Sequence, residues 1–462
     1  MNELNDPRLF KESDFFWVPL SLIVVYLFSY FKYRKYKHDL NTAPYFFPAL
    51  NLRLISAVIY GLIIEYYYGY GDTIMYYNAV QDMHRAVSDD VFFFKDIIGM
   101  ERLQSFDRIY PYFQFDGAGF TDLYMTNVHN FSVPKFALPF SLLFGKSYLG
   151  ISFCFSLFAF GGCWRLFKTF SALYPELIRK IAVATLFLPS LLFWGSSFLK
   201  DSICLGALGF LVAAAIDLFY FRKKVFNTFL WLIVSSVILY YVKPYIVLSF
   251  LLAFVVAVFL MFNNRIKNKT VRSASRFFFL VIAIGGVFFL LKSLAAFEIS
   301  SQYTTENIIK TMQGVQAGFE TTEGEGSFFK VGNVENSFGS LLYLFPAGVG
   351  TSLFRPFPWE VRNPLMVLSA LESFGLLILT IMLLRRAGFS KTIKTIVADP
   401  ILVFCLIFAI LFAGFVGVTT FNFGSLSRYR IPCLPFYLML IFIVGHKTRV
   451  FSSRYVFKKS LF

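Results

Sequence analysis

Long runs of apolar residues dominate the pattern along this chain. In runs such as 246–262 and 401–418 nearly every position is apolar, so no polar face remains to meet water. A helix needs roughly 20 such residues to cross the hydrocarbon core of a bilayer, at about 1.5 Å per residue. The pattern therefore predicts an all-α polytopic integral membrane protein. A transmembrane β-barrel would instead show short segments of alternating hydrophobicity.

The apolar runs predict about eleven transmembrane helices. They are expected near residues 15–31, 51–68, 147–167, 180–197, 200–221, 226–242, 244–262, 276–295, 363–385, 398–418 and 431–446. We treat residues 1–462 as a single transmembrane domain.

Composition supports the membrane class and gives the helices an orientation. Hydrophobic residues make up 57% of the chain and charged residues only 15%, against about 25% charged in soluble domains. Lys and Arg outnumber Asp and Glu by 43 to 27, a net charge of +16. The basic clusters lie between apolar runs, where they orient helices and meet anionic head groups, so nucleic acid is not an expected partner.

The positive-inside rule places the N-terminus outside and the C-terminus in the cytoplasm. With eleven alternating spans, each strongly basic connection then falls on the cytoplasmic side. This pattern is typical of a bacterial inner membrane protein. The basic connections cover residues 164–180, 222–224, 263–276, 385–394 and 446–462.

Two long segments, 68–145 and 297–362, fall on the extracytoplasmic side in this topology. The first combines many aspartates with aromatic residues, which predicts short amphipathic helices lying along the membrane surface. The second is rich in Gly, Thr and Glu around residues 321–326. These segments are where chemistry is expected.

Metal and nucleotide motifs are not visible in the sequence. The five cysteines show no Cys-x-x-Cys spacing, and the four histidines have no partner four residues away. There is no Gly-x-x-x-x-Gly-Lys-Ser/Thr phosphate loop either. We therefore expect neither a metal nor another cofactor.

Asp72 is the strongest catalytic candidate. It follows the second expected span in the sequence Tyr68-Gly-Tyr-Gly-Asp72, with Tyr76 and Tyr77 one helical turn later. A carboxylate at this position suits a general base that faces a membrane-embedded substrate, with the tyrosines contacting that substrate. The alternative is a structural role, because Gly-Asp before an amphipathic helix is also a common helix cap.

Cations at the expected outer ends of helices form a second candidate group. They run against the positive-inside bias, so they need another explanation. One is binding of a phosphate or pyrophosphate, to which Arg donates bidentate hydrogen bonds and Lys contributes point charge. The other is contact with ordinary phospholipid, or pairing with Asp201, Glu360 and Glu372. The cations are Lys200, Lys243, Arg355, Arg362, Arg428 and Arg430.

Glu372 lies about a third of the way into the span expected at 363–385. An ionisable group at that depth is costly unless it is paired or faces water. Glu372 is therefore either a possible proton relay or a neutral, hydrogen-bonded side chain.

Two segments together resemble the GT-C-fold glycosyltransferases. They are Gly71-Asp72-x-x-x-Tyr76-Tyr77-x-Ala79 and Ser427-Arg428-Tyr-Arg430-Ile-Pro432-x-Leu-Pro435-Phe. The resemblance implies a polytopic enzyme that uses polyprenyl-phosphate-linked sugars, with Asp72 as catalytic base. In that family the catalytic loop follows the first span, whereas here it follows the second.

The expected function is thus a membrane glycosyltransferase of cell-envelope glycan assembly. Its partners would be a lipid-linked sugar donor, a glycan or lipid acceptor, and membrane lipids. An O-antigen-type polymerase or ligase is an alternative that requires the arginines but not Asp72. A transporter or flippase for a lipid-linked glycan would rely on Glu372 and a cation-lined cavity, and a scaffold protein would need none of these residues singly.

Overall fold

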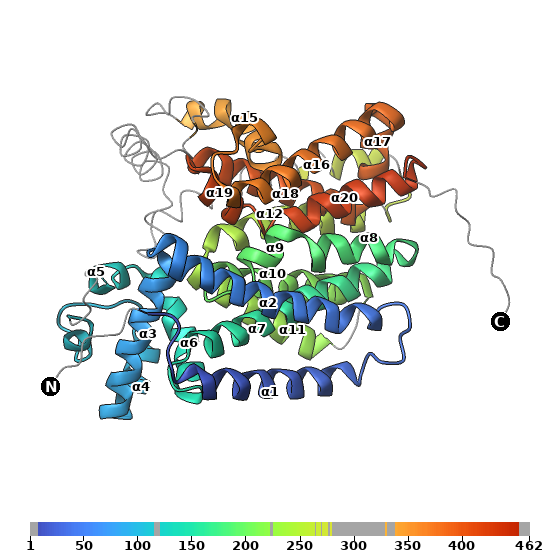
Figure 1. The fold of residues 1–462 in the computed structure, drawn as a ribbon. Helices are drawn as coiled ribbons and strands as arrows, with labels where there is room; N and C mark the ends of the chain where they lie inside the picture. The colour runs from blue at the N-terminus through green and yellow to red at the C-terminus, as the bar shows by residue number, and fades with distance from the viewer. Residues whose placement is uncertain are drawn as a thin grey trace. The chain divides into compact units, whose positions relative to one another are not determined.

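The computed structural model describes residues 8–114, 121–221, 225–263, 265–268, 270–275, 278–279, 329 and 338–451. Within this part of the chain every regular element is a helix. Eight helices are long and apolar enough to cross a membrane, or nine if one bent pair forms a single span (Figure 1). The eight cover Asp14–Tyr33, Ala43–Tyr68, Tyr148–Leu173, Lys200–Phe221, Val225–Val242, Pro244–Asn263, Pro364–Ala387 and Pro400–Thr419.

The chain is therefore an all-α polytopic membrane protein. The eight helices coincide with eight of the eleven expected spans, and the run at 431–446 is the second helix of the bent pair. The run at 180–197 is interrupted by breaks, and the run at 276–295 lies outside the described residues except for positions 278–279. The total of eleven remains a prediction.

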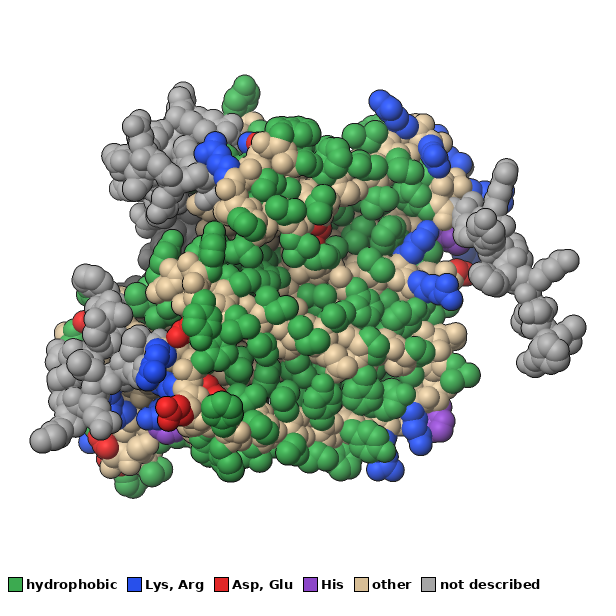
Figure 2. All heavy atoms as spheres, viewed as in Figure 1, with side chains coloured by type: hydrophobic (Ala, Val, Ile, Leu, Met, Phe, Trp, Pro, Cys, Tyr) green, Lys and Arg blue, Asp and Glu red, His purple; other side chains and the backbone are tan. Residues whose placement is uncertain are grey.

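The exposed surface has the polarity expected of a lipid-facing protein. In helix α1 (Asp14–Tyr33) the buried positions include Ser21 and Ser29, while Leu27 and Phe31 are exposed. Hydrophobic side chains likewise cover much of the face shown in Figure 2. A helix in water would bury residues such as Leu27 and Phe31 and expose residues such as Ser21 and Ser29.

The chain divides into two compact units, Met1–Val247 and Leu248–Phe462. In the first unit, spans α1, α2, α7, α10 and α11 are joined by short helices. Their bounds are α2 (Phe46–Ile63), α3 (Asp72–Asp89), α4 (Phe92–Gly99), α5 (Thr121–Met125), α6 (Val128–Leu143), α7 (Tyr148–Leu173), α8 (Ile178–Ala182), α9 (Pro189–Trp194), α10 (Lys200–Ile216) and α11 (Val225–Val242). Short 3-10 or π-helical turns extend or connect several of them: η1 (Ala43–Tyr45), η2 (Ile64–Tyr68), η3 (Tyr110–Gln114), η4 (Pro175–Leu177), η5 (Val183–Phe187) and η6 (Asp217–Phe221).

Helices α7 and α10 form the tightest contact of the first unit. A methyl group added at Gly162 would overlap the backbone carbonyl of Gly206, and one added at Gly209 would overlap that of Gly162. Small residues let helix backbones approach this closely, which is how helices associate where burial from water provides little driving force.

The expected span at 180–197 is broken because Pro189 starts a new helix and the chain leaves helical geometry again before α10. Carbonyls of the second break, at residues 195–198, accept hydrogen bonds from side chains of four other helices or helix ends. Away from water, irregular backbone is tolerated only when its N–H and C=O groups find hydrogen-bond partners in this way. The donors are Arg53 to Gly195 (2.8 Å), Ser156 to Ser196, Ser202 to Ser197 (2.6 Å) and Thr73 to Phe198 (3.5 Å).

The second unit is built around α15, α16, α18 and α20. Gly348 of α15 packs directly on Gly417 of α18, where an added methyl group would overlap backbone. Helices α19 and α20 form the bent pair, with an angle of 66° between them. The bounds are α12 (Pro244–Asn263, which begins in the first unit), α15 (Phe338–Phe354), η8 (Pro358–Glu360), α16 (Pro364–Ala387), α17 (Phe389–Val397), α18 (Pro400–Thr419), α19 (Phe423–Tyr429) and α20 (Leu434–Lys447).

Candidate functional site

Asp72 is the first residue of α3, directly after the end of a span. Gly69 adopts a left-handed conformation (φ 68°) and Gly71 has φ 133°, so the two glycines permit the sharp exit from η2. Gly71, rather than Asp72, occupies the N-cap position of α3. The half-buried Asp72 carboxylate lies in the first helical turn, where the helix dipole favours negative charge.

A tyrosine from α5 holds the Asp72 carboxylate. The Tyr124 hydroxyl donates a hydrogen bond of 2.8 Å to Oδ1 of Asp72. The hydroxyl of Tyr76 lies 3.5 Å from that of Tyr124, and the Tyr76 ring is fully buried near Phe198. The structure thus brings Asp72 and Tyr76 together through a residue that no sequence motif marks.

The same network continues to Lys200, the first residue of α10. Asn130 Nδ2 donates to the carbonyl oxygen of Tyr124 (3.0 Å), and Lys200 Nζ donates to Asn130 Oδ1. We call Asp72, Tyr76, Tyr124, Asn130 and Lys200 the loop cluster. It links a carboxylate to an ammonium group through two intermediate residues.

Lys243 forms a buried ion pair beside this cluster. Its Nζ lies 2.6 Å from Asp201 Oδ1, and the two side chains are only 7% and 1% exposed. This is one of the pairings considered from the sequence as an alternative to phosphate binding. It compensates the charge of Lys243 and ties the end of α11 to the first turn of α10.

His129 adds a neutral ring next to Asn130. Its Nδ1 donates to the carbonyl oxygen of Tyr241 at 2.8 Å. Burial, with the nearby positive charge of Lys200, holds the pKa of His129 below its ordinary value despite that hydrogen bond. His129 therefore contributes no positive charge near the loop cluster at neutral pH.

Tyr77 has a different environment from Tyr76. It is fully buried, its hydroxyl donates to the carbonyl oxygen of Lys146 (2.8 Å), and the Lys11 ammonium lies 5.1 Å from its ring centroid. These contacts fasten α3 to the turn between α6 and α7. A contact between Tyr77 and substrate stays a prediction.

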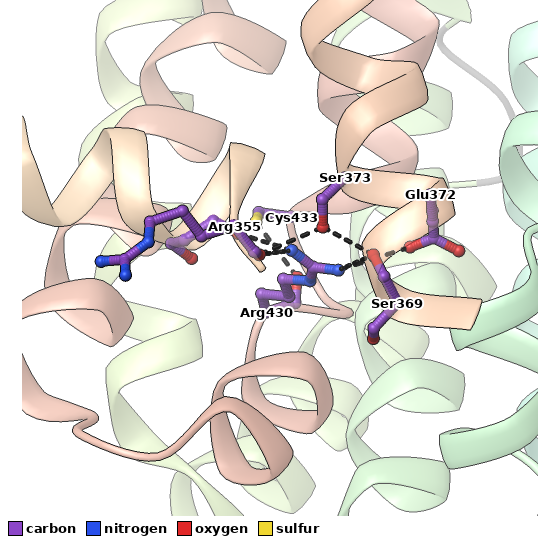
Figure 3. Close-up of polar contacts among 7 residues, drawn as sticks. Arg355, Ser369, Glu372, Ser373, Arg430 and Cys433 are labelled. Atoms are coloured by element: carbon purple, nitrogen blue, oxygen red, sulfur yellow. Dashed lines mark hydrogen bonds and ion pairs between the residues drawn. The ribbon is translucent and has the colours of Figure 1, made fainter. Parts of the chain in front are cut away.

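Arg430 forms the centre of a second cluster, in the second unit (Figure 3). Its fully buried guanidinium donates through Nη1 to the carbonyl oxygens of Ser352 (3.0 Å) and Arg355 (2.7 Å). Nη2 donates to the Ser369 carbonyl (3.3 Å) and lies 4.0 Å from Glu372 Oε1. Arg430 thus joins α15, α16 and the α19–α20 bend, and its contact with substrate stays a prediction.

The side chain of Arg355 is held between an acid and two aromatic rings. Nε donates to Glu360 Oε1 at 3.0 Å, and the guanidinium carbon lies 5.3 Å and 5.1 Å from the ring centroids of Phe329 and Phe423. Although burial alone would raise the pKa of Glu360, hydrogen bonds from Arg355 and the Phe357 N–H hold that pKa below its usual range. Among the described residues, Nη1 of Arg355 makes no hydrogen bond.

Arg362, Glu372 and Arg428 complete the predicted set. Arg362 is exposed in the connection between η8 and α16. Glu372 lies in α16 beside Arg430, the pairing considered from the sequence. Arg428 is half-buried at the end of α19, with its guanidinium carbon 5.7 Å from the ring centroid of Tyr429. No group of three or more His, Cys, Asp or Glu residues within the described ranges is arranged to hold a metal ion.

The described side chains can supply acid–base and electrostatic chemistry. The loop cluster combines a positioned carboxylate with an ammonium group, and the second unit presents Arg355 and Arg428. A search of protein-family models, curated proteins and solved structures finds no match to this chain.

Proposed function

We propose that this chain is a membrane glycosyltransferase. It moves a sugar from a polyprenyl-phosphate donor to a glycan or lipid acceptor, on the extracytoplasmic face of a bacterial inner membrane during envelope glycan assembly. The observation that supports this best is the half-exposed Asp72 carboxylate, held by Tyr124 immediately after the end of a span. This position suits a base whose substrates lie at the depth of the lipid head groups.

Asp72 acts as the general base in this proposal. The acceptor oxygen attacks the anomeric carbon of the sugar while its proton passes to the Asp72 carboxylate. The bond from the anomeric carbon to the phosphate oxygen breaks, and its electron pair stays on the departing polyprenyl phosphate. The Tyr124 hydrogen bond fixes the carboxylate before the acceptor arrives.

The cations stabilise the phosphate as its negative charge grows. Lys200 is assigned to that role, because it belongs to the loop cluster with Asp72 and keeps some exposure. Phosphate binding by Arg355 and Arg428 stays a prediction from the sequence. Lys243 and Arg430 are assigned to positioning, since each is buried and engaged with protein groups. Arg430 orients Arg355 by binding its carbonyl oxygen.

An O-antigen-type polymerase or ligase is the second candidate. Arg355 favours it, because this half-buried guanidinium keeps an edge that no described residue uses. Such an enzyme would depend on Arg355 and Arg428 and would tolerate loss of the Asp72 carboxylate.

The decisive experiment compares Asp72→Asn with Asp122→Asn. Asp122 is a suitable control because it also lies in the first long loop and also accepts a tyrosine hydrogen bond, from Tyr110 at 2.9 Å. Membranes with equal amounts of each variant are assayed for transfer of radiolabelled sugar from a polyprenyl-phosphate donor. We expect Asp72→Asn to lower transfer by about 10²–10⁴-fold, as loss of a general base does, and Asp122→Asn to leave it near wild type.

Other outcomes separate the alternatives. Normal transfer by Asp72→Asn would refute the assigned base. If Arg355→Gln and Arg428→Gln then abolished glycan extension, the polymerase or ligase would be favoured. If only Glu372→Gln caused a defect, with lipid-linked glycan accumulating on the cytoplasmic leaflet, a transporter would be favoured.

A further inference from the structure

Helix α17 joins two candidate spans through very short connections. Only Gly388 separates it from α16, and residues 398–399 separate it from α18. With nine residues, α17 is about 14 Å long, less than half the thickness of the hydrocarbon core. Since α16 ends and α18 begins on either side of it, α17 lies at a membrane surface and does not cross the membrane.

The apolar side of α17 is only partly covered by protein. Thr392 and Ile396 are buried in the second unit, whereas Phe389, Ile393 and Val397 are 70%, 37% and 51% exposed. The exposed residues recur every four positions, so they form one stripe beside the buried pair. This stripe remains apolar and uncovered at a place where lipid is the adjacent phase.

The surroundings of the stripe are strongly basic. Lys391 and Lys394 are exposed on α17, and Arg385 and Arg386 are exposed at the end of α16. No acidic residue occurs between 385 and 398, and Asp399 is paired with Lys447 of the neighbouring α20. Lys and Arg side chains are visible around α17 in Figure 2.

We infer that α17 and these basic side chains form a binding surface for anionic phospholipid. The stripe of Phe389, Ile393 and Val397 inserts among acyl chains, while the lysines and arginines bind the phosphate head groups. Because no acidic residue lies among these basic side chains, they should bind an anionic lipid more strongly than a zwitterionic one. This inference is independent of the proposed enzymatic activity.

The first test measures the depth of single positions. Phe389→Cys and Lys391→Cys carry a nitroxide label in the full chain, reconstituted in phosphatidylcholine vesicles with or without phosphatidylglycerol. Of the native cysteines, four are buried and Cys154 is half-buried, so unmutated protein gives the background labelling. We expect the label at 389 to be accessible to oxygen and shielded from a water-soluble nickel reagent, and the label at 391 to behave oppositely. Equal access of the nickel reagent at both positions would overturn the inserted stripe.

The second test measures lipid selectivity. The double variant Lys391→Gln/Lys394→Gln is compared with Lys95→Gln/Arg102→Gln, which removes the same charge from exposed positions in the first unit. We expect phosphatidylglycerol binding to the purified protein to weaken about tenfold in the α17 variant only, with a difference that shrinks at high salt. Equal phosphatidylglycerol binding by the two variants would overturn the anionic-lipid assignment.

Discussion

The Tyr124 hydroxyl donates to the Asp72 carboxylate at 2.8 Å, across 52 residues of chain. The bond joins a short helix of the first long loop to the start of α3. It leaves Asp72 half-exposed but limits the orientations of its carboxylate. In the proposed reaction, Tyr124 is thus a positioning residue for the base.

Tyr124→Phe tests this role. Loss of the hydroxyl frees the carboxylate to rotate, so we expect kcat for sugar transfer to fall by about tenfold while KM for the donor changes little. Tyr112→Phe is the control, because Tyr112 makes a similar bond of 2.9 Å to Asp89. Equal kcat values for the two variants would remove Tyr124 from the mechanism.

The spans were predictable wherever burial in lipid alone decides the helix. Runs such as 400–419 are apolar on every face, so their identity as spans needs no tertiary information. The run at 180–197 is equally apolar, yet Pro189 and the Gly195 region interrupt it. The Arg53 hydrogen bond to Gly195 stabilises that break. The local sequence does not predict this partner, because it lies 142 residues away in the chain.

The candidate site was predictable only in part, for the same reason. Asp72 stands out because glycines precede it, and the cations stand out against the charge bias of the chain. Tyr124 and Asn130 lie in an unremarkable polar stretch and acquire their roles only through packing of α5 and α6 on α3. The sequence offers Asp201 as a partner for one of the cations, but it does not identify Lys243 as the cation that reaches it.

Arg430→Lys should lower stability, whereas Arg428→Lys should lower sugar transfer. Arg430 donates to three backbone carbonyls, which a lysine cannot reproduce, so Arg430→Lys should lower the free energy of unfolding by about 1.5–3 kcal/mol. Arg428→Lys keeps the positive charge but loses the bidentate donor, so it should reduce transfer. Thermal unfolding in detergent and the transfer assay measure the two effects. A stable Arg430→Lys protein would contradict the structural role of Arg430.

The lowered pKa of His84 predicts that the stability of the protein depends on pH. Burial, with the positive charge of Lys146, lowers the pKa of His84 from 6.5 to about 4. The folded state therefore keeps this ring neutral, while the unfolded state takes up a proton below pH 6.5. The stabilisation is complete above pH 6.5 and is lost progressively as the pH falls from 6.5 through about 4.

Between pH 7 and pH 5, His84 should account for a loss of about 1 kcal/mol, allowing for solvent screening of this half-buried ring. Thermal unfolding of wild type and His84→Gln across that interval measures the contribution. We expect the variant to lose less stability than wild type between the two pH values. Parallel pH curves for the two proteins would show that His84 does not titrate in this way.

Gly162→Ala tests whether close backbone contact holds α7 and α10 together. The added methyl group overlaps backbone of Gly206, which cannot rotate away as a side chain can, so the helices must separate. We expect a loss of about 1–3 kcal/mol, typical of overpacking a well-packed core. Gly375→Ala in α16 is the matched control, because no atom lies within 4 Å of its added methyl group. That variant should match or exceed wild-type stability, since alanine favours a helix over glycine by about 1 kcal/mol. If Gly162→Ala were as stable as Gly375→Ala in thermal unfolding, the contact between the two glycines would not be what sets the spacing of α7 and α10.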